Sequence, residues 1–448
     1  MTDLAPAGTA PLSDDGRPGR AARAALRRAA PALLAYAGTR LLGIVVLAIW
    51  GAFADKSPHQ LLSARWDALW YARIAEEGYG YTIHLSDGSV HSNLAFFPLL
   101  PALERVISAI TPLDAADAGL LVSSVTSLFA AWGIFAIGDL LYGRRVGLTL
   151  AVLWGVLPVG IVQSMAYSES LFTALAAWGV YAALTRRWLW AALFAALAGL
   201  TRPVGAAVVA ALWVAAAVEL LPEGRRRQAG RTLPPVSHHH PQRKRFAPPP
   251  LTPVSHHHPQ RKRFAPPPLP SVSHHHPQRK RFAPPPLRLL AGVVLAPLGW
   301  LGYVVWVAVR TGSVTGYFDV QNGWGNGFDG GLAFAGFIGG LLIKPPFVGG
   351  LGLLLGVGAL IWLAVRCVRQ RQPLPLLAYG GAVLVLALAA KGYFGSKPRL
   401  LIPAFPLLLP IAVALARLRP VRSALVLGST GLASAVYGAF WLHGSGPP

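Results

Sequence analysis

A carboxylate between aromatic residues offers the clearest chemistry in this sequence. Residues 64–77 read Ala-Arg-Trp-Asp-Ala-Leu-Trp-Tyr-Ala-Arg-Ile-Ala-Glu-Glu and are followed by Gly78. Apolar residues at spacings of three and four predict a helix here, with Gly78 as its C-terminal cap. The apolar stripe of this helix would contain Trp66, Leu69, Trp70 and Ile74. Asp67 would then lie in the first turn, where a carboxylate can act as a general base or only stabilise the helix dipole.

Two arginines beside apolar segments are the second chemical feature. Arg202 and Arg399 each adjoin a long run of apolar residues. A charge near the middle of a bilayer is costly and usually has a partner. Because guanidinium groups bind phosphate oxygens through paired hydrogen bonds, both arginines are candidates to bind a lipid phosphate. Snorkelling of the side chains to lipid headgroups would explain the two arginines equally well.

The elements that must position these side chains are membrane-spanning helices. Of the 448 residues, 54% are hydrophobic and 13% are charged, whereas about a quarter are charged in average soluble domains. Apolar stretches of about 18 residues or more match the thickness of a bilayer core. We therefore predict an all-α polytopic membrane protein with about 11 transmembrane helices. The predicted spans are 31–53, 117–141, 146–165, 169–185, 188–201, 204–221, 290–309, 349–365, 374–390, 399–416 and 423–441.

The distribution of charge predicts the orientation. A net charge of +23 could suggest a nucleic-acid partner, but the basic residues form short clusters between apolar spans, which is the pattern that sets membrane topology. The N-terminus is then cytoplasmic, most Lys and Arg lie inside, and most Asp and Glu lie outside. Asp67, Glu169, Arg202, Gln321 and Arg399 all fall at or near the outer face, so we expect one site assembled between helix ends.

The spans are grouped into modules by long polar segments. We predict a basic cytoplasmic tail (1–30), an N-terminal transmembrane module (31–221) with a long outer loop (54–116), a cytoplasmic linker (222–289) and a C-terminal transmembrane module (290–448). The outer loop should carry interfacial helices, and 332–343 could be interfacial or re-entrant. The linker contains three 18-residue copies of one sequence at 235–288. The copies hold too little apolar surface to fold, so we interpret them as a disordered linker. Metal binding by the His triplets and lipid binding by the Arg-Lys-Arg triplets are the alternatives.

Several strings together resemble one family. The segment from Trp66 to Tyr79, followed by Asn93 to Pro101 with its Ala-Phe-Phe-Pro sequence, resembles the first luminal loop of the GPI mannosyltransferase 2 (PIG-V) family. Three later strings are similar to family patterns: Ser168 to Phe172, Gly199 to Pro203 with Gly205, and Pro398-Arg399 leading to Pro403 to Pro406. Phe318 with Gln321 and Trp324 resembles a pattern in bacterial relatives.

This resemblance implies a glycosyltransferase of the GT-C superfamily with a GT-C-like fold. Such enzymes take a sugar from a polyprenyl-phosphate lipid at the outer face, and their usual catalytic carboxylate maps to Asp67. The sequence departs from the family at Val204, where Asn is frequent, and in the longer stretch between Gly78 and Asn93. These departures put the sugar and the acceptor in doubt more than the chemistry.

The implied reaction assigns a role to each candidate residue. Asp67 is the expected general base, and Arg202 and Arg399 would bind the donor phosphate. The expected substrate-binding residues are Trp66, Trp70, Asn93, Phe97, Glu169, Gln321 and Trp324, although membrane anchoring would also explain the aromatic ones. Displacement in one step would invert the anomeric centre. We expect no cofactor, although Asp55, Asp67 and Asp87 could supply oxygen ligands to a divalent metal.

The resemblance favours polyprenyl-phosphate-mannose as donor. The acceptor is left open between a glycolipid, a glycan and a protein, and the Ala-, Gly-, Arg- and Pro-rich composition suggests a bacterial plasma membrane. A transporter or flippase for a polyprenyl lipid or small solute is the main alternative, because charges in a membrane protein can mark a substrate path. A non-catalytic membrane scaffold is a third possibility.

Overall fold

The computed structural model describes residues 18–221, 287–444 and 446. The elements before the gap are α1 (Pro18–Ala54), α2 (Pro58–Ser63), α3 (Asp67–Glu77), β1 (Thr82–His84), β2 (Val90–Ser92), η1 (Asn93–Ala95), α4 (Leu99–Ile110), α5 (Ala115–Tyr142), α6 (Arg144–Gly155), η2 (Gly160–Ser164), α7 (Ser168–Leu184), α8 (Trp188–Gly199), η3 (Pro203–Gly205) and α9 (Ala206–Leu220).

The elements after the gap are α11 (Leu287–Leu295), α12 (Leu298–Thr311), α13 (Gly316–Gly323), β3 (Gly327–Phe328), α14 (Leu332–Ile343), α15 (Val348–Arg369), α16 (Leu374–Ala389), β4 (Ala390–Lys391), η4 (Phe394–Ser396), α17 (Lys397–Leu400), η5 (Phe405–Leu408), α18 (Leu409–Arg417) and α19 (Pro420–His443). Two short antiparallel pairs, β1 with β2 and β3 with β4, accompany the helices.

The predicted helical, multi-span architecture is confirmed. Within the described residues, six helices are long and apolar enough to cross a membrane, or up to seven if a bent pair forms one span. Every predicted span contains a helix, but α8 and α16 are shorter apolar helices. The segment 332–343, predicted as interfacial or re-entrant, is the shorter apolar helix α14. The total of about 11 transmembrane helices therefore stays a prediction.

Three predicted spans are interrupted, and a proline lies at each break. The span predicted at 290–309 is divided into α11 and α12 at Pro297. The span predicted at 146–165 ends as α6 at Gly155, just before Pro158, and continues as the 3-10 turn η2. The span predicted at 399–416 is divided into α17, η5 and α18, and it bends by 74° at the break, where Pro403 and Pro406 lie. Proline lacks an N–H and clashes with the preceding helical turn. Each break therefore creates helix ends at which polar residues can lie.

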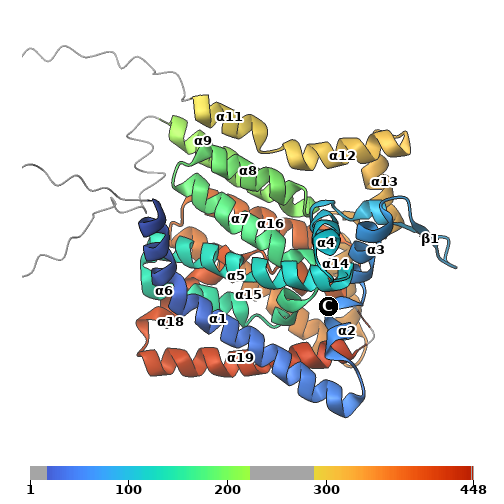
Figure 1. The fold of residues 1–448 in the computed structure, drawn as a ribbon. Helices are drawn as coiled ribbons and strands as arrows, with labels where there is room; N and C mark the ends of the chain where they lie inside the picture. Colours follow the sequence, from blue (N-terminus) through green and yellow to red (C-terminus); the bar gives the residue numbers. More distant parts are fainter. Residues whose placement is uncertain (1–17, 222–286, 445, 447–448) are drawn as a thin grey trace, which may run out of the picture. The chain divides into compact units, whose positions relative to one another are not determined.

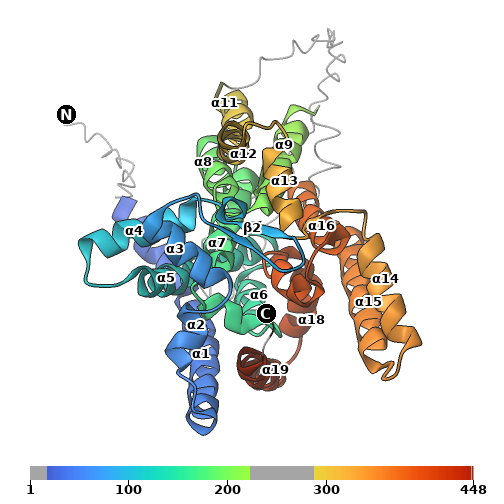
Figure 2. The ribbon, with the colours of Figure 1, turned by 90° about the vertical axis from the view of Figure 1, so that its right-hand side faces the viewer.

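The two predicted transmembrane modules pack together as one compact unit. Helix α1 packs along α19, α9 packs against α16, and α8 packs against α11, so the beginning and the end of the chain lie side by side (Figures 1 and 2). Small residues permit the closest approaches. A Cβ at Gly138 in α5 would lie 2.7 Å from the Cα atom of Gly147 in α6. The core is therefore built from Gly- and Ala-rich helix contacts.

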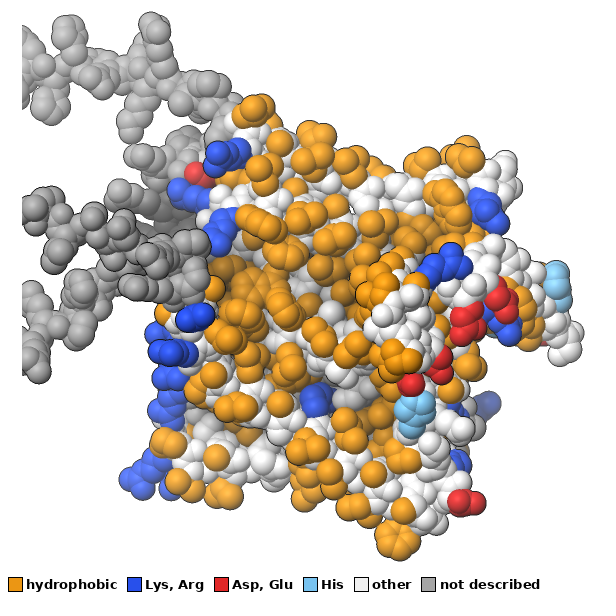
Figure 3. All heavy atoms as spheres, viewed as in Figure 1, with side chains coloured by type: hydrophobic (Ala, Val, Ile, Leu, Met, Phe, Trp, Pro, Cys, Tyr) orange, Lys and Arg blue, Asp and Glu red, His pale blue; other side chains and the backbone are white. Residues whose placement is uncertain are grey.

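Acidic side chains gather toward one end of the helices, whereas basic side chains lie at both ends. Figure 3 shows a row of Lys and Arg side chains along one end of the unit, and nearly all of the visible Asp, Glu and His side chains, together with further Lys and Arg, toward the opposite end. The acidic end contains α2, α3 and the β1–β2 hairpin (Figure 1). The segregation matches the pattern used to predict topology; which end is cytoplasmic stays a prediction.

The predicted polar segments are described only in part. The three repeats at 235–288 and the linker that contains them lie outside the described residues, apart from the last residues of each. The predicted basic tail 1–30 is helical from Pro18 onward, because α1 runs continuously through Arg20 to Ala30. Ala, Arg and Leu dominate this stretch, and all three are strong helix formers. Arg28 in it pairs with Asp139 of α5 at 2.5 Å.

Candidate active site

Helix α3 begins at Asp67, as the spacing of its apolar residues indicated. The N–H group of Gly78 donates to the carbonyl of Ile74, so the predicted cap is present. Ile74 is buried and Leu69 is 54% exposed. Trp66, which the predicted stripe included, lies just before the helix and not in it. The helix instead turns Ala68, Tyr71 and Ala75 toward the core.

Trp66, directly before this helix, has an unusual backbone conformation. Its φ is 51° and its ψ is −119°, a combination that non-glycine residues rarely adopt. Such strain costs about 1–3 kcal/mol and concentrates at functional sites. The Arg65 guanidinium lies over the Trp66 ring at 4.0 Å from its centroid. Arg65 thus packs against the residue at which the chain turns into α3.

Four charged residues that are distant in the sequence meet in one cluster. Arg399 Nη1 donates to Asp67 Oδ2 at 2.7 Å, and these residues are 332 positions apart. Glu169 Oε1 lies 2.6 Å from Arg202 Nη1 and 3.3 Å from Arg399 Nε. We call Asp67, Glu169, Arg202 and Arg399 the ion cluster. The formal charges of its two carboxylates and two guanidinium groups cancel.

Burial differs strongly within the ion cluster. The side chain of Glu169 is 1% exposed, and those of Arg399 and Arg202 are 9% and 12% exposed. Asp67 is 24% exposed, the most of the four. Buried charges are stable only when they are paired and hydrogen-bonded. Glu169 is paired with both arginines, but neither of its oxygens has a hydrogen-bond partner among the described residues, so it holds them by charge. Asp67 is the carboxylate that an incoming molecule can reach.

The turn that carries Arg202 is held by close backbone packing. Arg202 lies between α8 and η3, and a Cβ at Gly205 would lie 2.6 Å from the Cα atom of Gly199. The Leu99 N–H at the start of α4 donates to the carbonyl of Leu200 at 2.9 Å. Because the turn has so little space, Gly at these positions fixes the direction from which Arg202 enters the ion cluster.

Arg399 is positioned by a lysine that sequence reasoning missed. Lys397 is 5% exposed, and its Nζ donates to the carbonyls of Ala387, at 2.7 Å, and Ala390 at the end of α16. A cation at a helix C-terminus is favourable because the last carbonyls carry partial negative charge. Lys397 thus anchors the short helix α17 and the Arg399 side chain with it. The sequence signal that could have identified Lys397 is the presence of a second basic residue, beside Arg399, in an apolar region.

Three hydroxyl-bearing residues complete the surroundings of the ion cluster. Arg202 Nη1 donates to Ser168 Oγ at 2.9 Å, and Ser168 shares a hydrogen bond of 2.8 Å with the Tyr71 hydroxyl. Burial raises the pKa of Tyr71 well above its ordinary value, so its hydroxyl stays protonated. Arg399 lies over the Tyr167 ring at 5.1 Å. All three stand in or beside strings that resembled the family, although none was predicted as a site residue.

A group of aromatic rings adjoins the ion cluster. Trp70 stacks on Phe96 with centroids 5.6 Å apart and meets the edge of Trp324 at 4.8 Å. Phe96 in turn contacts the Tyr71 ring at 5.2 Å. Trp324 also stacks on His91 at 4.1 Å. We call Trp70, Phe96 and Trp324 the aromatic wall; all three side chains are partly exposed.

Gln321 supports the aromatic wall from behind. Its Nε2 donates to the carbonyl of Ala95 at 3.1 Å and to the Tyr317 hydroxyl at 3.0 Å. Its Oε1 accepts a hydrogen bond from Asn326. Trp324 Nε1 donates to the carbonyl of Ser92 at 2.9 Å. Gln321 therefore fixes the segment that presents Phe96, and its amide is already engaged on both sides.

Two predicted substrate-binding residues lie away from any accessible surface. Phe97 is 1% exposed and packs on Tyr303, with ring centroids 4.4 Å apart. Asn93 is fully buried, and its side-chain amide closes the loop that precedes it. Asn93 Oδ1 accepts from the Gly80 N–H at 3.0 Å, and Asn93 Nδ2 donates to the carbonyl of Gly78 at 3.1 Å. Both residues shape the loop from inside.

Replacing Asn93 with Ala should loosen this loop. Two hydrogen bonds to backbone groups are lost, which we expect to lower the free energy of unfolding by about 1–3 kcal/mol. Hydrogen exchange of residues 78–92 should accelerate, measured by mass spectrometry in detergent. Asn322→Ala, at an exposed position of α13, is the control and should leave this exchange unchanged. Equal protection in both variants would contradict the role of Asn93.

The metal ligands considered from sequence do not come together. Among the residues that the structure describes, no three His, Cys, Asp or Glu side chains are grouped so that they could hold a metal ion. Asp55 lies after α1 and Asp87 in the turn between β1 and β2, and Asp67 is paired with Arg399. His59, also in the outer loop, instead contacts Asp117 at 2.5 Å.

Glu104 is a buried carboxyl group in α4 that the sequence did not single out. It is 1% exposed, its Oε1 lies against the backbone of Gly119 in α5, and its Oε2 has no hydrogen-bond partner among the described residues. Burial raises the pKa of Glu104 from 4.5 to about 9, and Glu76 adds to the increase. Glu104 is therefore protonated at neutral pH.

This shift predicts a pH-dependent stability that Glu104→Gln removes. Between pH 4.5 and about 9 the folded protein binds one more proton at Glu104 than the unfolded chain, so stability falls as pH rises. Gln resembles the neutral acid, so the variant should match the original melting temperature near pH 5 and exceed it at pH 9. Thermal unfolding across this range checks the prediction, with Glu77→Gln, at an exposed position of α3, as the control. Parallel pH profiles for the original protein and Glu104→Gln would contradict it.

Comparison with known proteins gives few matches. No protein-family model matches the sequence, and no curated protein matches it. Two crystal structures of ArnT from Cupriavidus metallidurans are similar in fold. The one bound to undecaprenyl phosphate has a TM-score of 0.46 at 17% identity, covering 86% of this chain and 61% of ArnT. The apo structure has a TM-score of 0.44 at 14% identity, covering 92% and 62%. This chain thus spans about three fifths of the length of the ArnT chains that it matches.

Proposed function

We propose that this protein is a membrane glycosyltransferase of the GT-C type. It would transfer a sugar, mannose by the resemblance of its first loop, from a polyprenyl-phosphate donor to an acceptor at the outer face of the membrane. One observation carries the proposal: Asp67, Glu169, Arg202 and Arg399 form one ion cluster, although they come from four separate segments. The first loop contributes the accessible carboxylate, and the later segments contribute two arginines suited to phosphate.

Asp67 is the general base in this proposal. The pair with Arg399 engages Oδ2 of Asp67, so we assign the acceptor proton to Oδ1. As the acceptor oxygen bonds to C1 of the sugar, the bond from C1 to the phosphate oxygen breaks and its electron pair stays on the phosphate. The leaving phosphate needs no proton, so a single carboxylate suffices, unlike the paired carboxylates of most glycoside hydrolases.

The ion cluster can respond to the charge that develops on the phosphate. A polyprenyl-phosphate sugar carries one negative charge, and the departing phosphate carries two. When Asp67 takes up the proton it becomes neutral, and its attraction for Arg399 falls. Arg399 is then free to interact with the more negative phosphate, together with Arg202. Proton transfer and stabilisation of the leaving group are thereby coupled, and charge arranged in advance is the most effective catalytic device in a water-poor site.

Glu169 and the aromatic wall would position the reactants. Glu169 keeps Arg202 and Arg399 at fixed separation, since both contact the same oxygen. Trp70 and Trp324 offer partly exposed ring surfaces next to the ion cluster, as pockets that bind sugars or lipids require. Attack on a β-linked donor by one displacement would give an α-linked product.

Transfer of a labelled sugar tests the proposal. Purified protein in detergent would be incubated with radiolabelled polyprenyl-phosphate-mannose and a membrane-lipid extract, and with other polyprenyl-phosphate sugars in parallel. We expect label in a new glycolipid or glycan with one of these donors. If none is transferred, while proteoliposomes containing the protein move the intact donor between leaflets, the transporter alternative replaces the proposal.

A further inference from the structure

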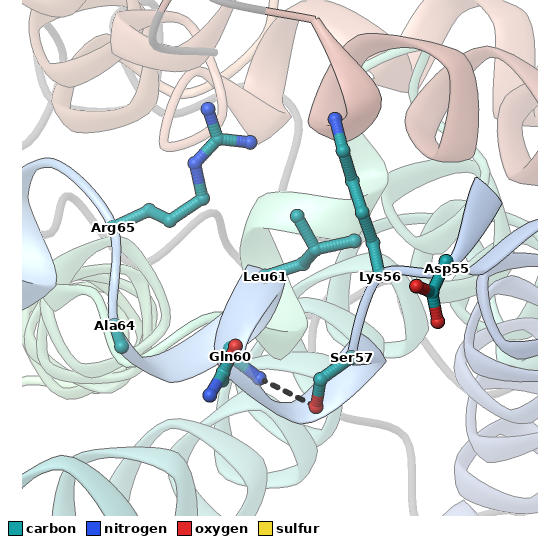
Figure 4. A pocket seen from close by; sticks show the side chains of 7 residues that line it. All are labelled: Asp55, Lys56, Ser57, Gln60, Leu61, Ala64 and Arg65. Carbon is teal, nitrogen blue, oxygen red and sulfur yellow. Dashed lines mark hydrogen bonds between the residues drawn. The ribbon is translucent and has the colours of Figure 1, made fainter.

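A polar cavity lies beside the loop that carries Asp67. Its volume is about 440 Å³, within the range of small-molecule sites. It is lined by the turn after α1, by α2 and by the two residues that follow α2, namely Asp55, Lys56, Ser57, Gln60, Leu61, Ala64 and Arg65 (Figure 4). None of these residues belongs to the ion cluster. The cavity ends at Arg65, two positions before Asp67 in the chain.

Two cationic side chains of this cavity are oriented by hydrogen bonds to backbone carbonyl groups. Arg65 Nη1 donates to the carbonyl of Leu442 at 2.6 Å, and its Nη2 donates to that of Gly444 at 3.0 Å. Lys56 Nζ donates to the carbonyl of His443 at 3.1 Å. In Figure 4 both side chains point toward the same side, away from α2. Carbonyls orient the charged groups but do not neutralise them as a carboxylate would.

The charge of the cavity therefore favours an anion. Within the described residues, neither Arg65 nor Lys56 forms an ion pair, and Asp55 is the one acidic side chain in the lining. An ammonium group and a guanidinium group retain several N–H donors after these carbonyl contacts. Phosphate oxygens accept such donors strongly. Ser57 and Gln60 add uncharged polar groups that suit the hydroxyls of a sugar or polyol.

The position of the cavity suits a lipid. Two candidate membrane spans, α1 and α19, end beside it at Ala54 and His443 and pack along each other. Large apolar side chains near these ends are exposed, with Phe53 at 88% and Phe440 at 59%. An acyl chain could follow these helices while the headgroup occupies the cavity, as expected where spans meet the interface.

We propose that this cavity binds the acceptor through a phosphate group attached to a sugar or polyol. Arg65 and Lys56 hold the phosphate, and the hydroxyl-bearing part extends toward Asp67. Arg65 is suited to couple the two places, because it stacks on Trp66, whose strained backbone precedes Asp67. The identification of the ligand as the acceptor rests on the proposed function. Binding of a ligand in the cavity can be measured without any sugar transfer.

Native mass spectrometry of the full chain tests the binding. The probes are phosphatidylglycerol, diacylglycerol as its phosphate-free counterpart, and sn-glycerol 3-phosphate as the soluble form of the same headgroup. The proteins are the original, Arg65→Gln, Lys56→Gln and Arg105→Gln. Arg105 is the matched control, since it lies in the same outer loop and also donates to carbonyls, those of Ala75 and Glu76.

The expected result is a selective loss of affinity. Losing a hydrogen bond to a charged group should raise the Kd for phosphatidylglycerol about tenfold or more in Arg65→Gln and Lys56→Gln, with no change in Arg105→Gln. Displacement by glycerol 3-phosphate would identify recognition of the phosphate itself, and failure to displace would identify recognition of the intact lipid. Equal affinity in all four proteins, or equal binding of diacylglycerol, would overturn the proposal.

The same measurement separates this proposal from the function. In an Asp67→Asn background, phosphatidylglycerol should bind the cavity as before, because Asp67 is outside its lining. Selective binding without any sugar transfer by the original protein would count against the glycosyltransferase and leave the anionic lipid site standing. Transfer that is unaffected by Arg65→Gln and Lys56→Gln, at every acceptor concentration, would leave the enzyme standing and reject the cavity as its acceptor site.

Discussion

Replacing Asp67 with Asn should lower kcat for sugar transfer by about 10²–10⁴-fold, the range that a positioned general base contributes. Asn keeps the size of the side chain and can still accept a hydrogen bond from Arg399, but it cannot take up the acceptor proton. The KM for the donor should change much less, because Arg202 and Arg399 stay in place. Initial rates with a labelled polyprenyl-phosphate sugar, over a range of donor and acceptor concentrations, would measure both quantities.

A carboxylate elsewhere in the same loop provides the control for this variant. Asp87 is exposed in the turn between β1 and β2 and bonds only to neighbouring Ser89 among the described residues. Asp87→Asn should therefore transfer sugar at the original rate. If Asp67→Asn retains near-normal kcat, Asp67 is not the base, whereas an equal loss in both variants would indicate damage to the loop.

Replacing Glu169 with Ala should destabilise the protein more than any surface substitution. The change removes a buried carboxylate that pairs with both Arg202 and Arg399. Breaking a buried ion pair in this way costs about 3–5 kcal/mol. Sugar transfer should fall with it, since the two guanidinium groups lose the oxygen that fixes their separation. Thermal unfolding in detergent would reveal the loss of stability.

Two comparisons make the Glu169 prediction specific. Glu77 pairs with Arg73 at 3.8 Å on an exposed face of α3, so Glu77→Ala should cost at most about 1 kcal/mol. In addition, removing Glu169 and Arg202 together should cost less than the sum of the two single changes, because neither member of this pair is then left without the other. Additive effects, or melting temperatures equal to that of Glu77→Ala, would show that the buried pair does not stabilise the fold.

Local features of the site could be predicted from the sequence because they depend on neighbouring residues. The helix at Asp67 and its cap at Gly78 follow from apolar spacing and from the backbone freedom of glycine. The membrane spans follow from hydropathy, and the location of the charged residues near one face follows from the distribution of Lys and Arg. These rules act over a few residues or over the thickness of a bilayer.

Pairing within the site could not be predicted, because it depends on tertiary packing. Nothing in the sequence around Arg399 indicates that Asp67, and not Glu169, accepts the hydrogen bond from Arg399 Nη1. Asn93 illustrates the same limit, since an amide near an aromatic motif suggests substrate binding, yet here it closes its own loop. The orientation of α3 also depends on its neighbours, which leave Leu69 exposed and bury Tyr71.

The proposed ion cluster would move a sugar from a lipid phosphate to an acceptor with inversion at C1. The most direct test uses a β-linked polyprenyl-phosphate-mannose that carries ¹³C at C1, with NMR detection of that carbon. The original protein and Asp87→Asn should convert the donor signal into that of an α-linked glycoside, and Asp67→Asn should not. A β-linked product, or equal conversion by Asp67→Asn, would contradict the account.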